Sequence, residues 1–240
     1  MERYFRIHVV LLSFIFVLGP KPAKAQLEVL LDFLIYDYGI LFGFEGEPGA
    51  FDIDFTTYPY QYDDVGLYLF PDEIGRRMNT YVDFRYQSNE DDVAGGWMQV
   101  KFSPISTITI DINHLQLYES VFAQDGFRYS FTNFSFQYNR VRGPRFHFWW
   151  SLGVTRFGGN VDDTEVGGSL GIGATYYIRK PVSLYTDFRW SYFPNTLGTT
   201  GVYDIRVQTH HKQFTVYAGL NILDGDFDWL SWSLGAGIHF

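Results

Sequence analysis

The stretch from Leu230 to Phe240 alternates without a break between apolar residues and small or polar residues. Its apolar positions are Leu230, Trp232, Leu234, Ala236, Ile238 and Phe240, and its other positions are Ser231, Ser233, Gly235, Gly237 and His239. Successive side chains of a β-strand point to opposite faces, so this pattern predicts a strand with one apolar and one polar face. A chain that repeats the pattern is restricted to an all-β fold.

The same period-two pattern returns throughout the sequence from residue 79 onward. The segments that carry it are 79–87, 96–102, 105–118, 126–139, 146–157, 169–178, 183–192, 203–208, 213–222 and 230–240. Two of them change phase midway, after Ile112 and after Phe131, which predicts a β-bulge near His114 and another near Asn133.

The first residues have the three-part layout of a secretory signal peptide. Arg3 and Arg6 precede the apolar run 9–18, and Ala23-Lys24-Ala25 supplies an Ala-x-Ala cleavage site. The run is too short for a spanning helix, so residues 1–25 are predicted to be removed and 26–240 to form the mature domain. Without residues 1–25 the chain keeps 14 basic against 26 acidic residues, a net charge of −12 that disfavours nucleic-acid binding.

Composition narrows the fold further without deciding it. Aromatic residues make up 20% of the chain, cysteine is absent, and mean hydropathy is only −0.09. A membrane barrel gives this mixture, because only alternate residues face lipid and aromatic girdles lie at both interfaces. A soluble sandwich also alternates, so composition leaves both open.

The alternating segment 230–240 with its aromatic last residue resembles the C-terminal signal of bacterial outer-membrane β-barrel proteins. The resemblance implies that the barrel-assembly machinery recognises Trp232, Leu234, Ile238 and Phe240, and that the last strand closes against the first. Together with the signal peptide it predicts an all-β, antiparallel, up-and-down transmembrane barrel in a bacterial outer membrane. Its partners would then be outer-membrane lipids and lipopolysaccharide.

The strand number depends on residues 27–70. Phe51, Ile53 and Phe55 followed by Val65, Leu67 and Leu69 resemble a hairpin, and 27–44 is almost continuously apolar. Bacterial single-chain barrels have even strand numbers, so twelve strands are favoured. Ten are the alternative if this first segment is a plug or a periplasmic cap.

Charges divide between the two sets of connections. Counting back from a periplasmic Phe240 assigns short links to the periplasm, with Arg140, Arg142, Arg145, Arg179, Lys180 and Lys212 in or beside them. The longer links fall outside, with Glu90, Asp91, Asp92, Asp162, Asp163, Glu165, Asp224, Asp226 and Asp228. Basic turns suit anionic phospholipid headgroups, and acidic loops either share divalent cations with lipopolysaccharide phosphates or are simply solvated.

Charged residues also occupy the polar face of the predicted strands. The main candidates for a polar network in the lumen are Asp83, Arg85, Asp187, Arg189, Asp204 and Arg206. The two Asp-x-Arg pairs at 187–189 and 204–206 lie on neighbouring strands, where each carboxylate is expected opposite a guanidinium. Such a network seals a small barrel, while the alternative is the lining of a substrate tunnel.

No catalytic, cofactor or metal site is predicted. His114, with Asp111, Asn113 and Ser106 nearby in sequence, lacks a hydrolase signature. The run 224–228 begins like a calcium loop, but Gly235 stands where a bidentate Glu is needed. The sequence therefore predicts a non-enzymatic structural component or a narrow, porin-like channel for a small or hydrophobic solute. The alternatives are a lipid-modifying enzyme of deacylase or phospholipase type, a protease, or a scaffold of a surface complex.

Overall fold

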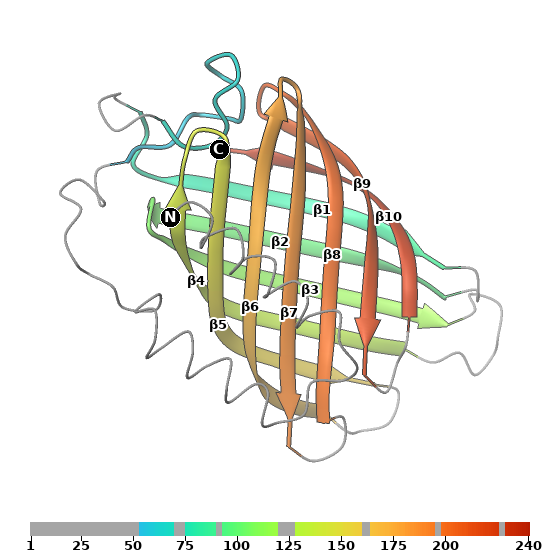
Figure 1. Ribbon diagram of the computed structural model, residues 1–240. Helices are drawn as coiled ribbons and strands as arrows, with labels where there is room; N and C mark the ends of the chain where they lie inside the picture. Colours follow the sequence, from blue (N-terminus) through green and yellow to red (C-terminus); the bar gives the residue numbers. More distant parts are fainter. Residues whose placement is uncertain are drawn as a thin grey trace, which may run out of the picture. The chain divides into compact units, whose positions relative to one another are not determined.

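A computed structural model describes residues 53–69, 75–89, 93–119, 128–159, 164–194, 198–225 and 229–240. The predicted signal peptide and the apolar segment 27–44 lie outside these residues. The described part is built from ten strands (Figure 1): β1 (Asn79–Ser88), β2 (Val93–Ile105), β3 (Ile108–Glu119), β4 (Arg128–Arg142), β5 (Phe146–Gly158), β6 (Thr164–Arg179), β7 (Val182–Phe193), β8 (Gly198–His211), β9 (Phe214–Asp224) and β10 (Trp229–His239). Among the same residues, no helix is long and apolar enough to cross a bilayer.

The ten strands form one closed antiparallel barrel in which each strand pairs with its neighbours in sequence. The ring closes between β1 and β10, where Tyr81 faces His239 and Ser88 faces Trp232. The all-β up-and-down barrel is therefore confirmed, with the ten strands that were the alternative and not the favoured twelve. Because β1 and β10 use each other's edges, no edge is left for a further hairpin.

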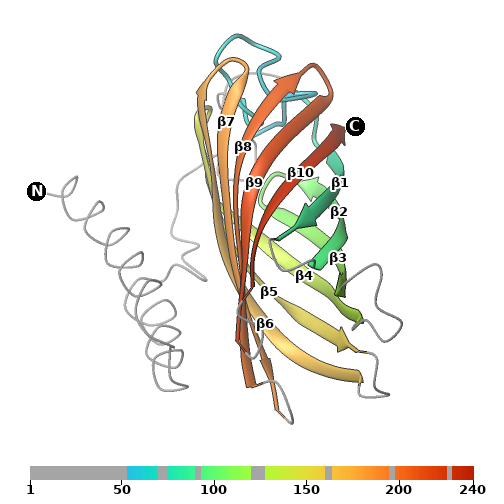
Figure 2. The ribbon, with the colours of Figure 1, turned by 90° about the vertical axis from the view of Figure 1, so that its right-hand side faces the viewer.

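The hairpin predicted over 51–69 is the reason for the wrong count. In its described part the segment does fold back on itself, since the Thr56 amide donates to the Leu67 carbonyl and the Leu69 amide to the Asp54 carbonyl. It forms only isolated β-bridges, however, and is not a strand of the barrel. Tyr60 and Asp63 adopt positive φ angles of 63° and 46°, which curl the chain into a compact loop. Residues 53–69 lie across one end of the barrel, and we call them the cap (Figure 2).

Connections differ at the two ends of the barrel. The links 106–107, 143–145, 180–181 and 212–213 are tight turns at the end that carries the cap and Phe240, which we call the turn end. The links at the opposite loop end are longer, for example between Glu119 and Arg128. The predicted segments 96–102 and 105–118 leave Ser103 and Pro104 for the turn between them, but β2 continues to Ile105 and the turn follows at 106–107.

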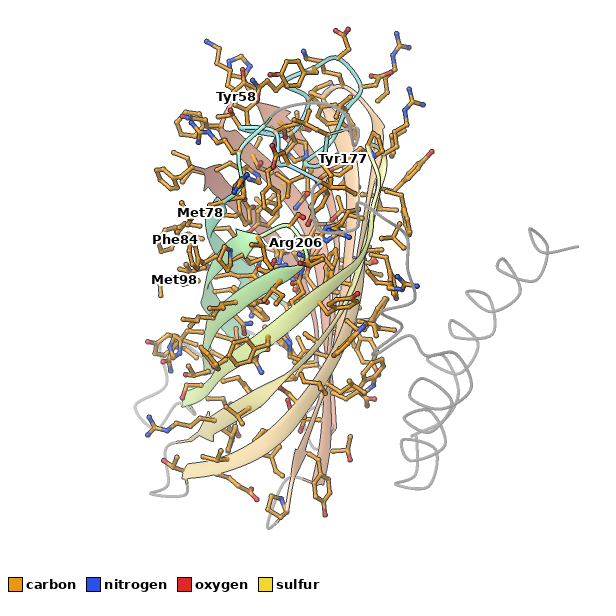
Figure 3. The ribbon with its side chains drawn as sticks, turned by 90° about the vertical axis from the view of Figure 1, so that its left-hand side faces the viewer. Tyr58, Met78, Phe84, Met98, Tyr177 and Arg206 are labelled. Carbon is orange, nitrogen blue, oxygen red and sulfur yellow. The ribbon has the colours of Figure 1, made fainter. Side chains whose placement is uncertain are left out.

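Side chains alternate between the outer wall and the lumen along every strand. On β10 the apolar series predicted from the sequence faces outward, while Ser231, Ser233 and His239 are buried inside. Phe84 and Met98 likewise point away from the barrel, whereas Arg206 lies within it (Figure 3). The barrel is therefore apolar outside and largely polar inside.

The bulges predicted near His114 and Asn133 are wrong. The β2–β3 and β3–β4 registers run without a shift through both positions, so Leu115 and Phe131 point into the lumen. The apolar residues change face because part of the lumen is itself apolar. The observed register shifts lie near the turn end, for example between Phe102 and Ile105.

Candidate functional site

The middle of the lumen contains the polar network predicted from the sequence, which we call the charged network. All six residues proposed from the sequence point inward and are at most 7% exposed: Asp83, Arg85, Asp187, Arg189, Asp204 and Arg206. The strands β1, β7 and β8 supply two each. Closure of the barrel brings β1 within reach of β8, although more than a hundred residues separate them.

Arg206 is the centre of one half of this network. Its Nη1 lies 2.7 Å from Asp83, and its guanidinium also binds Asp204 on the same strand. Arg85 shares Asp204 at 2.8 Å, and the Tyr217 hydroxyl donates to Asp83 at 2.8 Å. The Arg206 guanidinium also lies over the Tyr217 ring.

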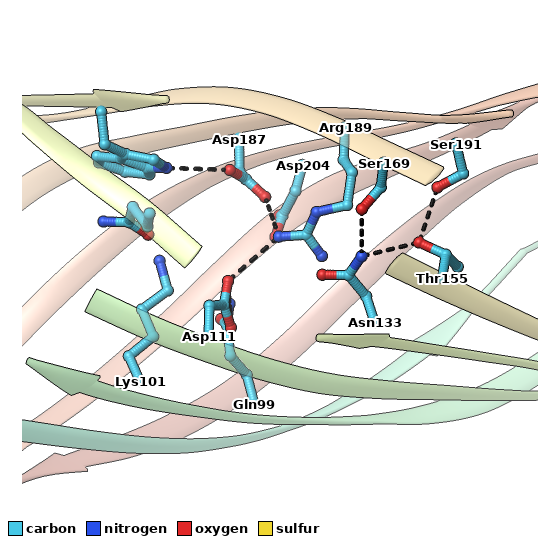
Figure 4. Close-up of polar contacts among 12 residues, drawn as sticks. Gln99, Lys101, Asp111, Asn133, Thr155, Ser169, Asp187, Arg189, Ser191 and Asp204 are labelled. Carbon is cyan, nitrogen blue, oxygen red and sulfur yellow. Dashed lines mark hydrogen bonds and ion pairs between the residues drawn. The ribbon is translucent and has the colours of Figure 1, made fainter. Parts of the chain in front are cut away.

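The other half is built around Arg189 and differs from the expected interlocking pairs. Asp187 stands directly opposite Asp204, so the two Asp-x-Arg pairs do not face each other with opposite charges. Arg189 instead binds Asp187 at 3.3 Å and crosses to Asp111 at 3.2 Å (Figure 4). The side-chain amide nitrogen of Gln99 donates to both carboxylate oxygens of Asp111, at 2.9 and 3.0 Å.

Asp111 and Lys101 are site residues that the six-residue prediction omitted. Their inward positions in the alternating pattern were the available signal. With them, the central lumen holds four carboxylates (Asp83, Asp111, Asp187, Asp204) and four cations (Arg85, Lys101, Arg189, Arg206). The lumen is charge-balanced at this level, which favours a packed interior over a selective pore.

Toward the loop end the lumen is filled by apolar side chains. This loop-end cluster comprises Trp97, Leu115, Leu117, Phe131, Phe157, Phe193, Leu223 and Trp229, each less than 10% exposed. Phe157 packs on Phe131 and Phe193 with ring centroids 5.0 and 6.3 Å apart. The cluster occupies the lumen on the loop-end side of the charged network.

The cap closes the turn end through three kinds of contact. The Tyr68 hydroxyl lies 3.2 Å from Nε2 of buried His147, the Tyr60 hydroxyl binds the Val182 carbonyl, and the Gly66 amide donates to the Pro144 carbonyl at 2.6 Å. Burial raises the pKa of both tyrosines above the usual 10.0, so their hydroxyls stay protonated.

Gly66 fits the cap to the barrel. A Cβ there would lie 2.2 Å from the Tyr177 ring, so the cap backbone reaches this ring only because residue 66 has no side chain. At the rim, Asp64 pairs with Arg145 at 3.1 Å and accepts from the Lys180 amide at 3.1 Å.

A cavity of about 70 Å³ remains between the cap and the charged network. Pro59, Leu67 and Tyr68 of the cap form one side, and Arg206 lies on its network side. Lys101 also lines this cavity.

The histidine considered as a catalytic base does not assemble a site. His114 faces the outer wall and its Nδ1 lies 2.8 Å from the Thr132 hydroxyl, while Asp111 and Asn113 face the lumen. Ser106 lies in the turn before β3. These residues therefore cannot act together.

A different serine–histidine contact occurs near the cap. Ser183 Oγ lies 2.7 Å from Nε2 of His210, whose Nδ1 contacts Thr215 at 2.9 Å. Ser183 is 0% exposed and the partner of the histidine is a hydroxyl, not a carboxylate. This contact therefore packs the lumen and offers no accessible nucleophile.

No cluster of potential metal ligands occurs among the described residues. Asp224 and Gly225 of the calcium-like run are described, and the rest of that run lies outside the described part.

No family model matches the chain, and no curated protein matches it. Among solved structures, it is similar to the N-terminal β-barrel domain of Pseudomonas aeruginosa OprF, at 12% identity and a TM-score of 0.39 over 68% of this chain and 97% of that one. It is also similar to Neisserial surface protein A, at 13% identity and a TM-score of 0.38 over 70% and 98%. A loop-deletion mutant of OmpT, an outer membrane protein of Vibrio cholerae, matches at 12% identity and a TM-score of 0.36 over 66% and 62%.

Proposed function

We propose that this chain is an integral protein of a bacterial outer membrane, with a closed lumen and a structural, non-enzymatic role. The observation that carries the proposal is the inverted distribution of polarity. Charged and amide side chains fill the interior, while Phe84, Val216, Leu220 and Leu234 are each more than half exposed on the wall.

An apolar outer wall is favourable only against an apolar medium. Each large aliphatic or aromatic side chain gains roughly 1.5–3 kcal/mol on leaving water, and the wall carries such side chains on every strand. A closed barrel also satisfies its backbone hydrogen bonds between strands, as hydrocarbon requires. Both properties favour a bilayer as the surroundings of the barrel.

Three closures support a structural role over an open channel. The cap, the charge-balanced network and the loop-end cluster follow one another along the lumen. The runner-up, a narrow channel, requires all three to move.

We further expect orientation and assembly to follow from the two ends. Exposed basic residues such as Arg140, Arg179 and Lys212 lie at the turn end, which suits phospholipid headgroups on the periplasmic side. Trp232 and Leu234 are exposed on the outer wall of β10, and Phe240, directly after that strand, is exposed too, so the barrel-assembly machinery could recognise all three.

The membrane placement is tested by Leu220→Arg, with Thr199→Arg as the matched control. Leu220 points outward in the middle of β9, and Thr199 points outward at the loop end of β8. Arginine on the lipid face costs about 2–4 kcal/mol at the bilayer midplane and about 0–1 near an interface. In lipid vesicles, urea unfolding should show this difference, whereas equal tolerance of both variants contradicts the proposal.

The closed lumen is tested separately by conductance in planar bilayers. The folded protein should give no steady pore current. A stable open channel in the unmodified protein would favour the porin-like alternative.

A further inference from the structure

We propose that the cavity beneath the cap is a binding site for a small oxyanion, a carboxylate or a phosphate, held by the Lys101 ammonium. The cavity lies in the lumen between the cap and the charged network, and about 70 Å³ is room for a few waters or one such ion. The inference goes beyond the proposed structural role and does not depend on it.

The charge of the cavity wall is the first argument. Lys101, Arg206 and the histidines 147, 210 and 239 line it, and none of the described lining residues is acidic. Arg206 is already paired with Asp83 and Asp204. Although the lumen as a whole is balanced at this level, the residues that line the cavity are net positive, and Lys101 is the one of its two permanent cations that forms no ion pair.

No described carboxylate lies within ion-pair distance of the Lys101 ammonium, and Asp187 interacts with it only from farther away. Asp111 lies opposite Lys101 on β3, but its carboxylate accepts a hydrogen bond from Gln99 and pairs with Arg189 (Figure 4). The ammonium donates to the Tyr185 hydroxyl at 3.2 Å and lies over the Trp149 ring at 4.8 Å. An ammonium has three donors, and a cation withdrawn from water is stabilised by an anion.

Polar atoms without partners lie in the same wall. The Asn79 side-chain nitrogen, the Tyr81 hydroxyl and Nδ1 of His239 are buried and make no hydrogen bond with a described residue. Tyr81 stands between His239 and Lys101 on three adjacent strands, and Asn79 is the next inward residue toward the turn end. The Asn79 nitrogen and the Tyr81 hydroxyl, and Nδ1 of His239 when it carries the ring proton, can donate further hydrogen bonds to the oxygens of an anion in the cavity.

The test is calorimetric titration of the full chain, folded in detergent, at constant ionic strength in chloride. Sodium acetate and sodium phosphate are the probes, and acetamide is the uncharged match for acetate. Saturable binding of one equivalent of either anion, with much weaker binding of acetamide, supports the proposal. No saturable binding, or equal affinity for acetamide, overturns it, as does binding that chloride competes away at equal concentration.

Three variants locate the site. Lys101→Gln removes the charge and should weaken binding by about tenfold or more, because a hydrogen bond to a charged group is stronger than one between neutral groups. Asn79→Asp keeps the size of the side chain but places a competing carboxylate in the wall, and should abolish binding. Lys212→Gln, in an exposed turn at the same end, is the control and should bind as the unmodified protein does.

Folding of each variant is checked first by its migration on a gel before and after heating. If Lys101→Gln fails to fold, Asn79→Asp decides alone. Unchanged affinity in a folded Lys101→Gln or Asn79→Asp variant overturns the site. Neither result bears on membrane placement, which the Leu220→Arg comparison tests independently.

Discussion

Replacing Arg206 by Leu should destabilise the barrel strongly, because it leaves one buried carboxylate without a cation. Arg206 is 1% exposed and Asp83 is 0% exposed. Asp204 keeps Arg85 at 2.8 Å, but Asp83 keeps only the neutral Tyr217 hydroxyl. Breaking a buried ion pair by removing one partner costs about 3–5 kcal/mol, so Arg206→Leu should lower the free energy of unfolding by about that amount.

The double variant separates the lost pair from lost packing. Adding Asp83→Asn to Arg206→Leu removes the stranded charge, so the double variant should be more stable than the sum of the two single changes predicts. The coupling between the two sites should be about 1–3 kcal/mol. Arg145→Gln is the control, because the Arg145–Asp64 pair is 58% and 39% exposed and should contribute less than about 1 kcal/mol.

The assay is reversible urea unfolding in lipid vesicles, followed by tryptophan fluorescence, of five proteins: the unmodified protein, Arg206→Leu, Asp83→Asn, the double variant and the Arg145→Gln control. Near-equal stability of Arg206→Leu and the unmodified protein would refute the reasoning. So would strict additivity of the two lumen substitutions, since each would then act through packing alone.

Two further predictions concern the fit of glycine in the wall and the docking of the cap. Gly173→Ala should lower the free energy of unfolding by about 1–3 kcal/mol, because its Cβ would lie 2.3 Å from Trp149, while Gly168→Ala, with nothing within 4 Å, should be nearly neutral in the same urea assay. Because burial raises the pKa of Tyr60 and Tyr68, their stabilisation of the docked cap is complete below the usual tyrosine pKa of 10.0 and is lost as pH rises above it. Proteolysis within residues 53–69 should therefore accelerate above about pH 10, and substituting both tyrosines by Phe should remove that pH dependence.

The strands could be predicted because the outer face and the lumen of the barrel favour different side chains, so apolar and polar residues alternate along each strand. Wherever the outer face is apolar and the lumen polar, facing can be read directly, as along Leu230 to Phe240. The small residues on the inner face follow the same logic, since Gly173 makes room for Trp149 across the β5–β6 pair. Such local rules need no knowledge of the closed ring.

The alternating pattern gave a wrong prediction where the lumen itself is apolar. Leu115 and Leu117 were read as a change of phase because apolar residues were assigned to the outside. In the structure they face inward and pack in the loop-end cluster. The prediction of two further barrel strands failed for a different reason. Residues 53–69 alternate as barrel strands do, but β1 and β10 already pair with each other, so residues 53–69 fold across the end of the barrel.

Partners within the lumen depend on closure and register, which single strands do not encode. The sequence placed Asp187 and Asp204 on neighbouring strands, but only the register shows that the two carboxylates are opposite each other. Because the two carboxylates face each other, they pair with different cations: Asp187 pairs with Arg189, and Asp204 pairs with Arg206 and Arg85. Pairing across the barrel, such as Arg206 with Asp83, follows only when the ring is closed.

The order of the three closures determines which end a ligand of the lumen would reach. The charged network separates the loop-end cluster from the cavity under the cap, and Arg206 belongs both to the network and to the cavity wall. The cap residues Leu67 and Tyr68 line the same cavity. Because the cap and the network lie on different sides of this cavity, an anion held by Lys101 would exchange past the cap at the turn end, without breaking an ion pair of the network.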